Sequence, residues 1–195
     1  MIELPPPDRE ERIAAIASCG VPAANIRIVY EEYLQSDVVK ISDIGSVSEE
    51  RLRCVQRAVH PFDTVEIEDR EQNEAYWRLV IDDARARAHV EGQEWLQDRG
   101  MLEQMPRFEP GGDLRAFARA VEAHCGADVG SALQVLSENI LTFQATYVRS
   151  LIDASSGMER GEEFTCLCNV LAASGLSEGG ITFGFVGYAA TDEPE

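Results

Sequence analysis

The longest periodic segment of the sequence runs from Arg70 to Arg99 and predicts one long helix. Apolar or small residues recur every three or four positions on one face of it, namely Trp77, Ile81, Ala84, Ala88, Gly92 and Trp95. Because the middle of this face is small, we expect another helix or strand to cross it closely. Gly92 costs roughly 1 kcal/mol of helix propensity against alanine, which favours a packing role for it. The alternative is that the helix breaks at Gly92.

The segment before this helix contains signals for two helices and three strands. Asp8 is a suitable N-cap and Gly20 a suitable C-terminal cap for a first helix over 8–20. Alternating apolar residues predict strands over 26–30 and 38–41 with a turn near 35–37. A second helix over 46–60 ends at Pro61, and a short strand over 63–69 follows.

The same order of elements is predicted after residue 112. A helix capped by Asp113 ends at Gly126, and a hairpin over 131–148 turns at 137–139. A helix over 162–175 follows, although "FTCLCNVL" within it also fits a strand. The last element is a strand over 179–191. Two prolines and two glycines in residues 101–112 indicate a linker between the halves.

The repeated order predicts an α+β fold with two α-β-β-α-β halves that diverged from an internal duplication. Cys19-Gly20 and Cys125-Gly126 both end a first helix. Cys54 and Cys168 both precede an alanine by four residues in a second helix, and we expect them to correspond. The predicted domains are residues 1–100, which include the long helix 70–99, and residues 113–195. The halves form two small sheets or one fused sheet.

The chain is strongly acidic, with a formal net charge of −18. Residues 1–100 contain 12 basic and 21 acidic residues and residues 101–195 contain 5 and 14, so each half carries −9. Arginines interrupt the acidic stretches. We expect no nucleic-acid partner and no membrane partner, because such a surface repels anionic backbones and lipids. The surface favours solubility and suits a basic partner. A DNA mimic would need carboxylates aligned on one face, and dispersed acidity is usually explained by solvation alone.

The cysteines are five in number: Cys19, Cys54, Cys125, Cys166 and Cys168. The N-terminal sequence "MIELPPPDREER" lacks a basic start followed by an apolar stretch, so it predicts no secretory signal and a cytoplasmic location. In that compartment disulfides are rare. We therefore expect all five cysteines to be reduced and buried.

The stretch "AHCGADVG" raises the question of a catalytic cysteine at Cys125. A helix C-terminus disfavours a thiolate, and adjacent helical residues point about 100° apart, so His124 is a poor base for Cys125. His60 and His89 are the other candidate partners. Cys166 and Cys168 lack zinc spacing, although a site with a histidine is an alternative.

Acidic clusters are the remaining candidates for chemistry. Glu66, Glu68 and Asp69 follow or belong to a strand, and Asp82 and Asp83 lie in the long helix. They suit cation binding or acid–base catalysis, but a solvated strand edge and helix start explain them equally well. The glycines of "GGITFGFVG" lack the strand–loop–helix context of a phosphate-binding loop. We predict no cofactor and no metal, and we assign no catalytic residue.

Two functional classes fit these observations. The first is a non-catalytic protein-interaction or regulatory module that binds a protein partner or a second copy of itself. Its surface would be "GITFGFVGY" or "MLEQMPRF", where exposed Met and Phe would mark a binding site. The second is a small hydrolase-like or metal-dependent enzyme that uses carboxylates or Cys125. A concave pocket with converging polar groups would favour the enzyme.

Overall fold

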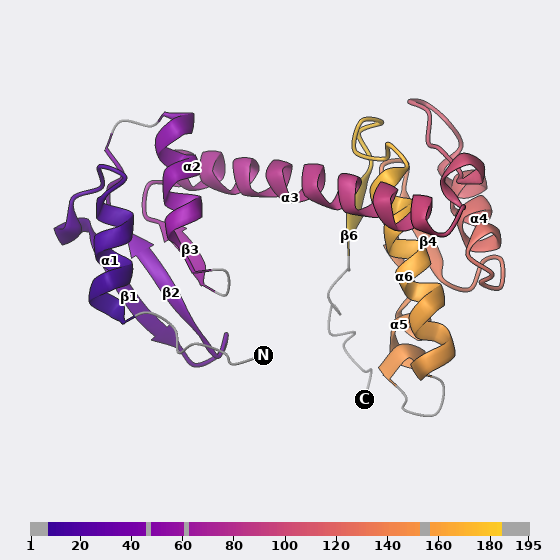
Figure 1. Cartoon of the computed structure of the whole chain (residues 1–195), viewed down its shortest axis with the longest axis horizontal. Helices are drawn as coiled ribbons and strands as arrows, with labels where there is room; N and C mark the ends of the chain where they lie inside the picture. The colour runs from indigo at the N-terminus through magenta and orange to yellow at the C-terminus, as the bar shows by residue number, and fades with distance from the viewer. Residues whose placement is uncertain (1–7, 46–47, 61–62, 153–156, 185–195) are drawn as a thin grey trace, which may run out of the picture. The chain divides into compact units, whose positions relative to one another are not determined.

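The computed structural model describes residues 8–45, 48–60, 63–152 and 157–184. For residues 157–160 it describes the backbone only. The fold is α+β, as predicted (Figure 1). Contacts divide the chain into two compact units, Met1–Ala84 and Arg85–Glu195. The division falls inside the long helix, whereas the sequence suggested a boundary at 101–112. No helix among the described residues combines the length and apolar character needed to cross a bilayer.

The first unit is a three-stranded sheet with helices packed on it. Its elements are α1 (Arg9–Ala17), β1 (Ile26–Glu31), β2 (Ser36–Ile41), α2 (Glu49–Ala58), β3 (Thr64–Ile67) and the beginning of α3 (Arg70–Asp98). The strand order is β1-β2-β3, with β1 and β2 antiparallel and β2 and β3 parallel. Its core includes Ile16, Val39 and Val55, all fully buried, and Tyr76 of α3 packs against them.

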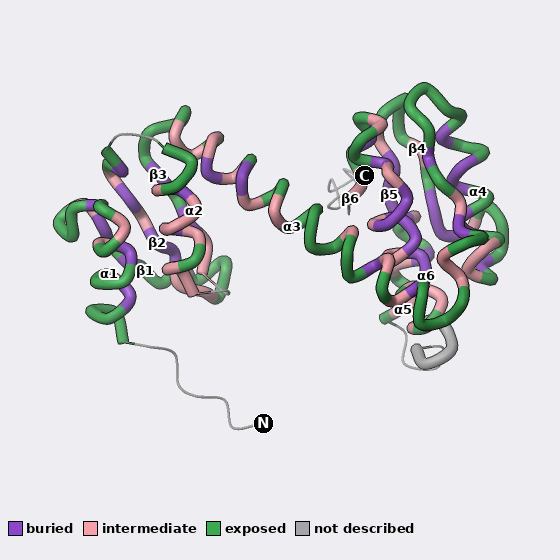
Figure 2. The backbone as a smooth tube through the Cα atoms, turned by 45° about the horizontal axis from the view of Figure 1, so that its top comes forward, coloured by how far each residue is buried: buried purple, intermediate pink, exposed green. Residues whose placement is uncertain are grey.

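The second unit contains the rest of α3 and a second small sheet. Its elements are α4 (Leu114–His124), β4 (Leu133–Ser137), β5 (Ile140–Phe143), α5 (Ala145–Ile152), α6 (Gly157–Ala173) and β6 (Thr182–Gly184). The strand order is β4-β5-β6, again with an antiparallel and then a parallel pair. Buried residues follow β5 and α6 in Figure 2, and Leu141, Leu167 and Val170 are fully inaccessible.

The helix α3 confirms the prediction of one long helix with a close crossing. At Gly92 a Cβ atom would lie 2.8 Å from the carbonyl oxygen of Asn169, so α6 passes almost in backbone contact. The helix does not break there. Within the first unit, Trp77 Nε1 donates a hydrogen bond to the Val65 carbonyl at 3.2 Å.

Four of the five cysteines form two disulfides, so the expectation that all cysteines are reduced is wrong. Cys19 is bonded to Cys54, and Cys125 to Cys166, each pair with Cα atoms 5.6 Å apart. The first bond ties the residues after α1 to α2, and the second ties the end of α4 to α6. Among the five, Cys168 alone is free, and it is half-buried. Their spacing in the sequence does not reveal which thiols meet in space, and the expectation of reduced cysteines rested on a predicted location alone.

The disulfides also correct the correspondence between the halves. Cys54 occupies the place of Cys166 and not of Cys168, because Cys166 closes the equivalent bond. Strand order and disulfide position agree in both units, and element order agrees except for the additional helix α5 in the second unit. The common ancestry of the halves stays a prediction.

Two further elements differ from the sequence expectation. The predicted hairpin over 131–148 ends at Phe143, and the helix α5 begins at Ala145. The stretch "FTCLCNVL" is helical, so the strand alternative is wrong, and α6 starts at Gly157. Residues 101–112 are part of the second unit and not a free linker, because Met105 and Phe108 lie in its core.

Candidate functional site

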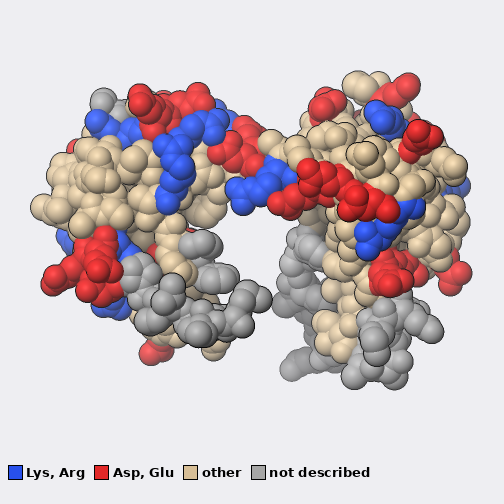
Figure 3. Space-filling view, in the orientation of Figure 1, with Lys and Arg blue, Asp and Glu red and all other residues tan. Residues whose placement is uncertain are grey.

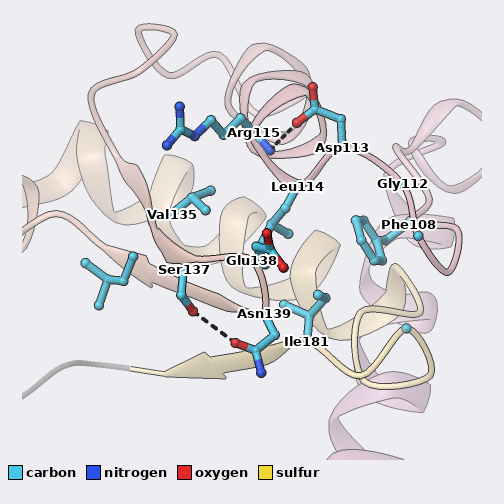
Figure 4. Close-up of a pocket in the computed structure, with 13 residues that line it drawn as sticks. Phe108, Gly112, Asp113, Leu114, Arg115, Val135, Ser137, Glu138, Asn139 and Ile181 are labelled. Carbon is cyan, nitrogen blue, oxygen red and sulfur yellow. Dashed lines mark hydrogen bonds between the residues drawn. The ribbon is translucent and has the colours of Figure 1, made fainter.

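A groove of about 740 Å³ opens in the second unit between the start of α4 and the turn that joins β4 and β5 (Figure 4). The third wall comes from the loop before α4 and from the residues that precede β6. Figure 4 shows Phe108, Leu114 and Ile181 entering from three separate segments. A volume of this size is typical of ligand sites.

The floor of the groove is apolar and tightly packed. Phe108, Leu114 and Ile181 are each less than a tenth exposed. The Phe108 ring meets Phe117 edge-on, with centroids 5.4 Å apart. Gly179 makes room for this ring, since a Cβ atom there would lie 2.7 Å from Phe108 Cδ1. The floor is therefore held in place by the core beneath it.

The rim of the groove is polar. Asp113 caps α4 by accepting hydrogen bonds from the backbone N–H groups of Arg115 (2.9 Å) and Ala116 (3.2 Å). The Ser137 hydroxyl donates to Asn139 Oδ1 at 2.9 Å and stiffens the β4–β5 turn. The side chains of Arg115 and Glu138 are exposed at the same rim. The groove thus combines a fixed apolar floor with one cationic and two anionic side chains at its entrance.

The first unit fills the equivalent place with an ion cluster. Asp37 lies two residues before Val39, which pairs with Val65, and Asp63 directly precedes β3. Asn139 lies two residues before Leu141, which pairs with Phe183, and Ile181 directly precedes β6. Two carboxylates in the first unit thus correspond to an amide and an isoleucine in the second.

In the first unit, Arg12 of α1 fills the position that corresponds to the groove. Its guanidinium donates to Asp37 at 2.7 Å and to Asp63, and only 7% of Arg12 is exposed. Burial lowers the pKa of Arg12, but hydrogen bonds and charges from both carboxylates raise it above its ordinary value. In the second unit Arg115 of α4 is exposed at the rim and does not fill the groove, which stays open.

A second hollow of about 870 Å³ in the same unit borders the Cys125–Cys166 disulfide. Glu162, Glu163 and the Arg99 guanidinium line it, and Arg99 stacks 3.9 Å above the Trp95 ring. Its lining also includes Trp95 and Met101, so charged and apolar side chains are mixed along it.

Cys125 does not fit the role of a nucleophile. Its sulfur is bonded to Cys166, so the oxidised chain has no thiolate at this position. His124 ends α4 beside it, and its Nε2 atom is buried without a hydrogen-bond partner among the described residues. Burial lowers the pKa of His124.

The other predicted candidates lie apart from one another. Glu66 faces solvent on β3 and pairs with Lys40 at 3.5 Å, Glu68 is exposed, and Asp69 caps the start of α3 by accepting from Gln72 N–H at 2.9 Å. Asp83 pairs with Arg53 at 2.7 Å. Asp82 borders a shallow hollow on α2 and α3.

The remaining histidines and sulfurs lie in ordinary structural positions. His89 Nδ1 lies 3.1 Å from the Ala172 carbonyl oxygen, and His60 is half-buried at the end of α2. Burial raises the pKa of the Cys168 thiol to about 11. Within the described ranges, no three His, Cys, Asp or Glu side chains are arranged to hold a metal ion.

In the two segments proposed as exposed binding surfaces, the described Met and Phe side chains are buried or partly buried. Met105 and Phe108 of "MLEQMPRF" are buried. Ile181 is buried, and Phe183 packs edge-on against Phe143 with ring centroids 5.3 Å apart. The rest of "GITFGFVGY" lies outside the described residues.

Sequence reasoning missed the groove, although it located two of its parts. Asp113 was recognised as a cap and Ser137–Asn139 as a turn, but nothing in the sequence indicates that they meet Phe108 and Ile181. The one available signal was the internal comparison, because the second half lacks the acidic pair that holds Arg12.

Searches against protein-family models, curated proteins and solved structures found no match. The groove's own chemistry therefore carries the functional argument.

Proposed function

We propose that the chain is a non-catalytic protein-interaction module whose second unit binds a short segment of a partner protein in the groove between α4 and the β4–β5 turn. The observation that carries this proposal is the contrast between the units. One topology fills this place with Arg12 and two carboxylates in the first unit, and leaves it open over an apolar floor in the second.

The lining of the groove indicates the chemistry of the segment. Phe108, Leu114 and Ile181 suit an apolar side chain, which would gain about 25 cal/mol for each Å² of apolar surface removed from water. Glu138 at the rim suits a neighbouring basic side chain, and the net charge of −18 favours a basic partner through long-range attraction. We therefore expect an apolar residue next to Lys or Arg.

The many acidic residues on the visible surface are consistent with a basic partner segment. Asp and Glu side chains are spread over the faces of both units seen in Figure 3, with Lys and Arg side chains among them. Several of these charges are paired, as in Arg53–Asp83 and Arg70–Glu74. Dispersed charge of this kind steers a basic partner and leaves the groove to provide specificity.

The test is selection of a displayed library of linear peptides on the disulfide-bonded protein, followed by affinity measurement. Leu136 lines the groove and is 47% exposed, so Leu136→Lys alters the groove with little risk to folding. The matched control is Val129→Lys, at a 59% exposed residue that does not line the groove.

We expect selected peptides to carry an apolar residue next to a basic one and to lose at least about tenfold in affinity with Leu136→Lys, equivalent to roughly 1.4 kcal/mol. Glu138→Lys should weaken them as well, and Val129→Lys should leave binding unchanged. Peptides that bind wild type and Leu136→Lys equally would exclude the groove as the site.

A further inference from the structure

Exposed apolar side chains concentrate in the β1–β2 hairpin of the first unit, far in sequence from the groove. Nine large hydrophobic residues are exposed among the described residues, and four of them belong to this hairpin: Val29, Tyr30, Tyr33 and Leu34. Tyr33 is 82% exposed. Such clustering is typical of a surface that contacts another protein.

The strand β1 is also an unpaired edge. It lies at the end of the β1-β2-β3 order, and no described segment pairs with its outer side. An open strand edge presents free N–H and C=O groups that can add a strand from another chain. Alternation along β1 places Ile26 and Ile28 against the helices, and Arg27, Val29 and Glu31 on the opposite face.

We propose that two copies of this chain associate through antiparallel pairing of their β1 strands about a two-fold axis at Val29. The paired edges would join two three-stranded sheets into one of six strands. This self-association surface is independent of the groove.

The side chains of β1 select this register over its neighbours. With Val29 opposite Val29 of the second copy, Arg27 lies opposite Glu31 twice, and Ile28 lies opposite Tyr30 twice. Opposite charges and apolar pairs directly across a strand boundary are stabilising. With a two-fold axis at one residue, even-numbered residues lie opposite even-numbered ones and odd opposite odd. The side chains of each opposed pair therefore point to the same face of the joined sheet.

The two adjacent registers and an axis at Arg27 are less favourable. An axis at Tyr30 places Val29 opposite Glu31 and leaves that charge without a partner across the boundary. An axis at Arg27 brings the two Arg27 side chains together, and like charges directly opposite are destabilising. An axis at Ile28 places Arg27 opposite Val29 and leaves its charge without a partner across the boundary.

Charged residues on edge strands often prevent association, and Arg27 would do so against most partners. Against a second copy its charge is matched by Glu31. Lys40 already holds Glu31 at 3.0 Å within the sheet, so that carboxylate is fixed in position before association. The edge is therefore self-complementary.

The first test is the oligomeric state of charge variants by sedimentation velocity over a concentration series. Wild type is expected to sediment as a dimer. Arg27→Glu and Glu31→Arg alone should be monomers, since each puts like charges together twice. An equimolar mixture of the two should form heterodimers, because both pairs are then opposite in sign.

The mixture also serves as the control for folding, since only folded variants can recover association. A wild-type chain that stays monomeric throughout the series would overturn the proposal, as would Arg27→Glu that remains dimeric. Failure of the mixture to associate, with both variants showing native circular dichroism, would exclude this register.

The second test is site-specific cross-linking in a Cys168→Ala background. Opposed Cα atoms in an antiparallel pair are about 4.5–5.5 Å apart, within the range that a disulfide bridges. Val29→Cys should therefore form a covalent dimer under mild oxidation.

Arg27→Cys is the matched control. In the proposed register, residue 27 of one copy lies opposite residue 31 of the other. The two residues 27 are therefore four positions apart along the strands, about 13 Å, which a disulfide cannot span. Cross-linking of Arg27→Cys at the same rate as Val29→Cys would contradict the register.

Discussion

Glu122 illustrates how one side chain organises a turn of the second unit. It is 1% exposed, and its carboxylate accepts hydrogen bonds from the backbone N–H groups of Gly130 (2.5 Å), Ala132 and Leu133 (both 2.8 Å). These bonds fix the chain as it leaves α4 and enters β4. A carboxylate with three such donors is replaced poorly by any neutral side chain.

We predict that Glu122→Gln lowers the free energy of unfolding by about 2–4 kcal/mol. The amide loses the negative charge and turns one donor toward other donors, at a cost of roughly 1–3 kcal/mol for each buried group left unpaired. Urea denaturation is the measurement. Glu109→Gln, at an exposed position, should change stability by less than about 0.5 kcal/mol.

Gly92 allows a second residue-scale prediction with an internal control. Gly92→Ala should destabilise the protein by about 1–3 kcal/mol, because its Cβ would clash with the Asn169 carbonyl oxygen. A Cβ atom added at Gly161 in α6 would meet no atom within 4 Å. Gly161→Ala should therefore be stabilising by about 0.5–1 kcal/mol through helix propensity alone. Equal effects of the two changes would contradict the close crossing.

We predict that His124 makes the stability of the fold depend on pH. Burial lowers its pKa in the folded state, so the unfolded chain binds more protons as the pH falls below the ordinary histidine value of about 6.5. The contribution of neutral His124 is therefore fully present above that pH and is lost as the pH falls through the folded pKa. The stability difference between wild type and His124→Gln should shift in favour of the variant between about pH 7.5 and about pH 5, measured by denaturation at each pH. A difference that does not vary with pH would contradict it.

At the scale of elements, each disulfide joins the end of one helix to the middle of another. The two bonds close separations of 35 and 41 residues. Loop-closure entropy assigns about 4 kcal/mol to each bond. We predict that Cys125→Ala/Cys166→Ala lowers the free energy of unfolding by roughly this amount, measured by urea denaturation.

Thiol labelling with mass spectrometry provides the matching control. The native oxidised chain should label at no more than Cys168, and slowly, because its pKa of about 11 keeps the thiol protonated near neutral pH. Rapid labelling of all five cysteines without reductant would contradict both disulfides.

Prediction from sequence succeeded where a local signal decided the outcome. Asp8, Asp113 and Gly126 marked helix ends correctly, and period-two alternation located β1 and β2. It failed where tertiary contacts decided. "QATYV" alternates like a strand, yet Tyr147 is buried against Phe143 from the helix α5.

The candidate site was harder to predict than the fold. Cys54 and Cys168 matched by spacing, but the sulfur that meets Cys125 belongs to Cys166. The groove residues Phe108, Asn139 and Ile181 are far apart in sequence, and only the strand register brings them together. No local pattern contains that information.

At the scale of the whole molecule, two separate cores predict two cooperative units. Val55 is fully buried in the first core and Leu167 in the second. We predict that Val55→Ala lowers the midpoint of one calorimetric transition and Leu167→Ala that of another, each costing about 2–4 kcal/mol. A single transition that shifts equally with both variants would show that the shared helix α3 couples the units into one.

The disulfides have a consequence for a chain that has been cut. Trypsin cleaves after Arg27 or Lys40 inside the loop closed by Cys19 and Cys54, and after Arg149 inside the loop closed by Cys125 and Cys166. Fragments from such nicks stay covalently joined and migrate together on a gel until a reductant is added. A single cut in the exposed β1–β2 hairpin therefore leaves every part of the chain covalently attached.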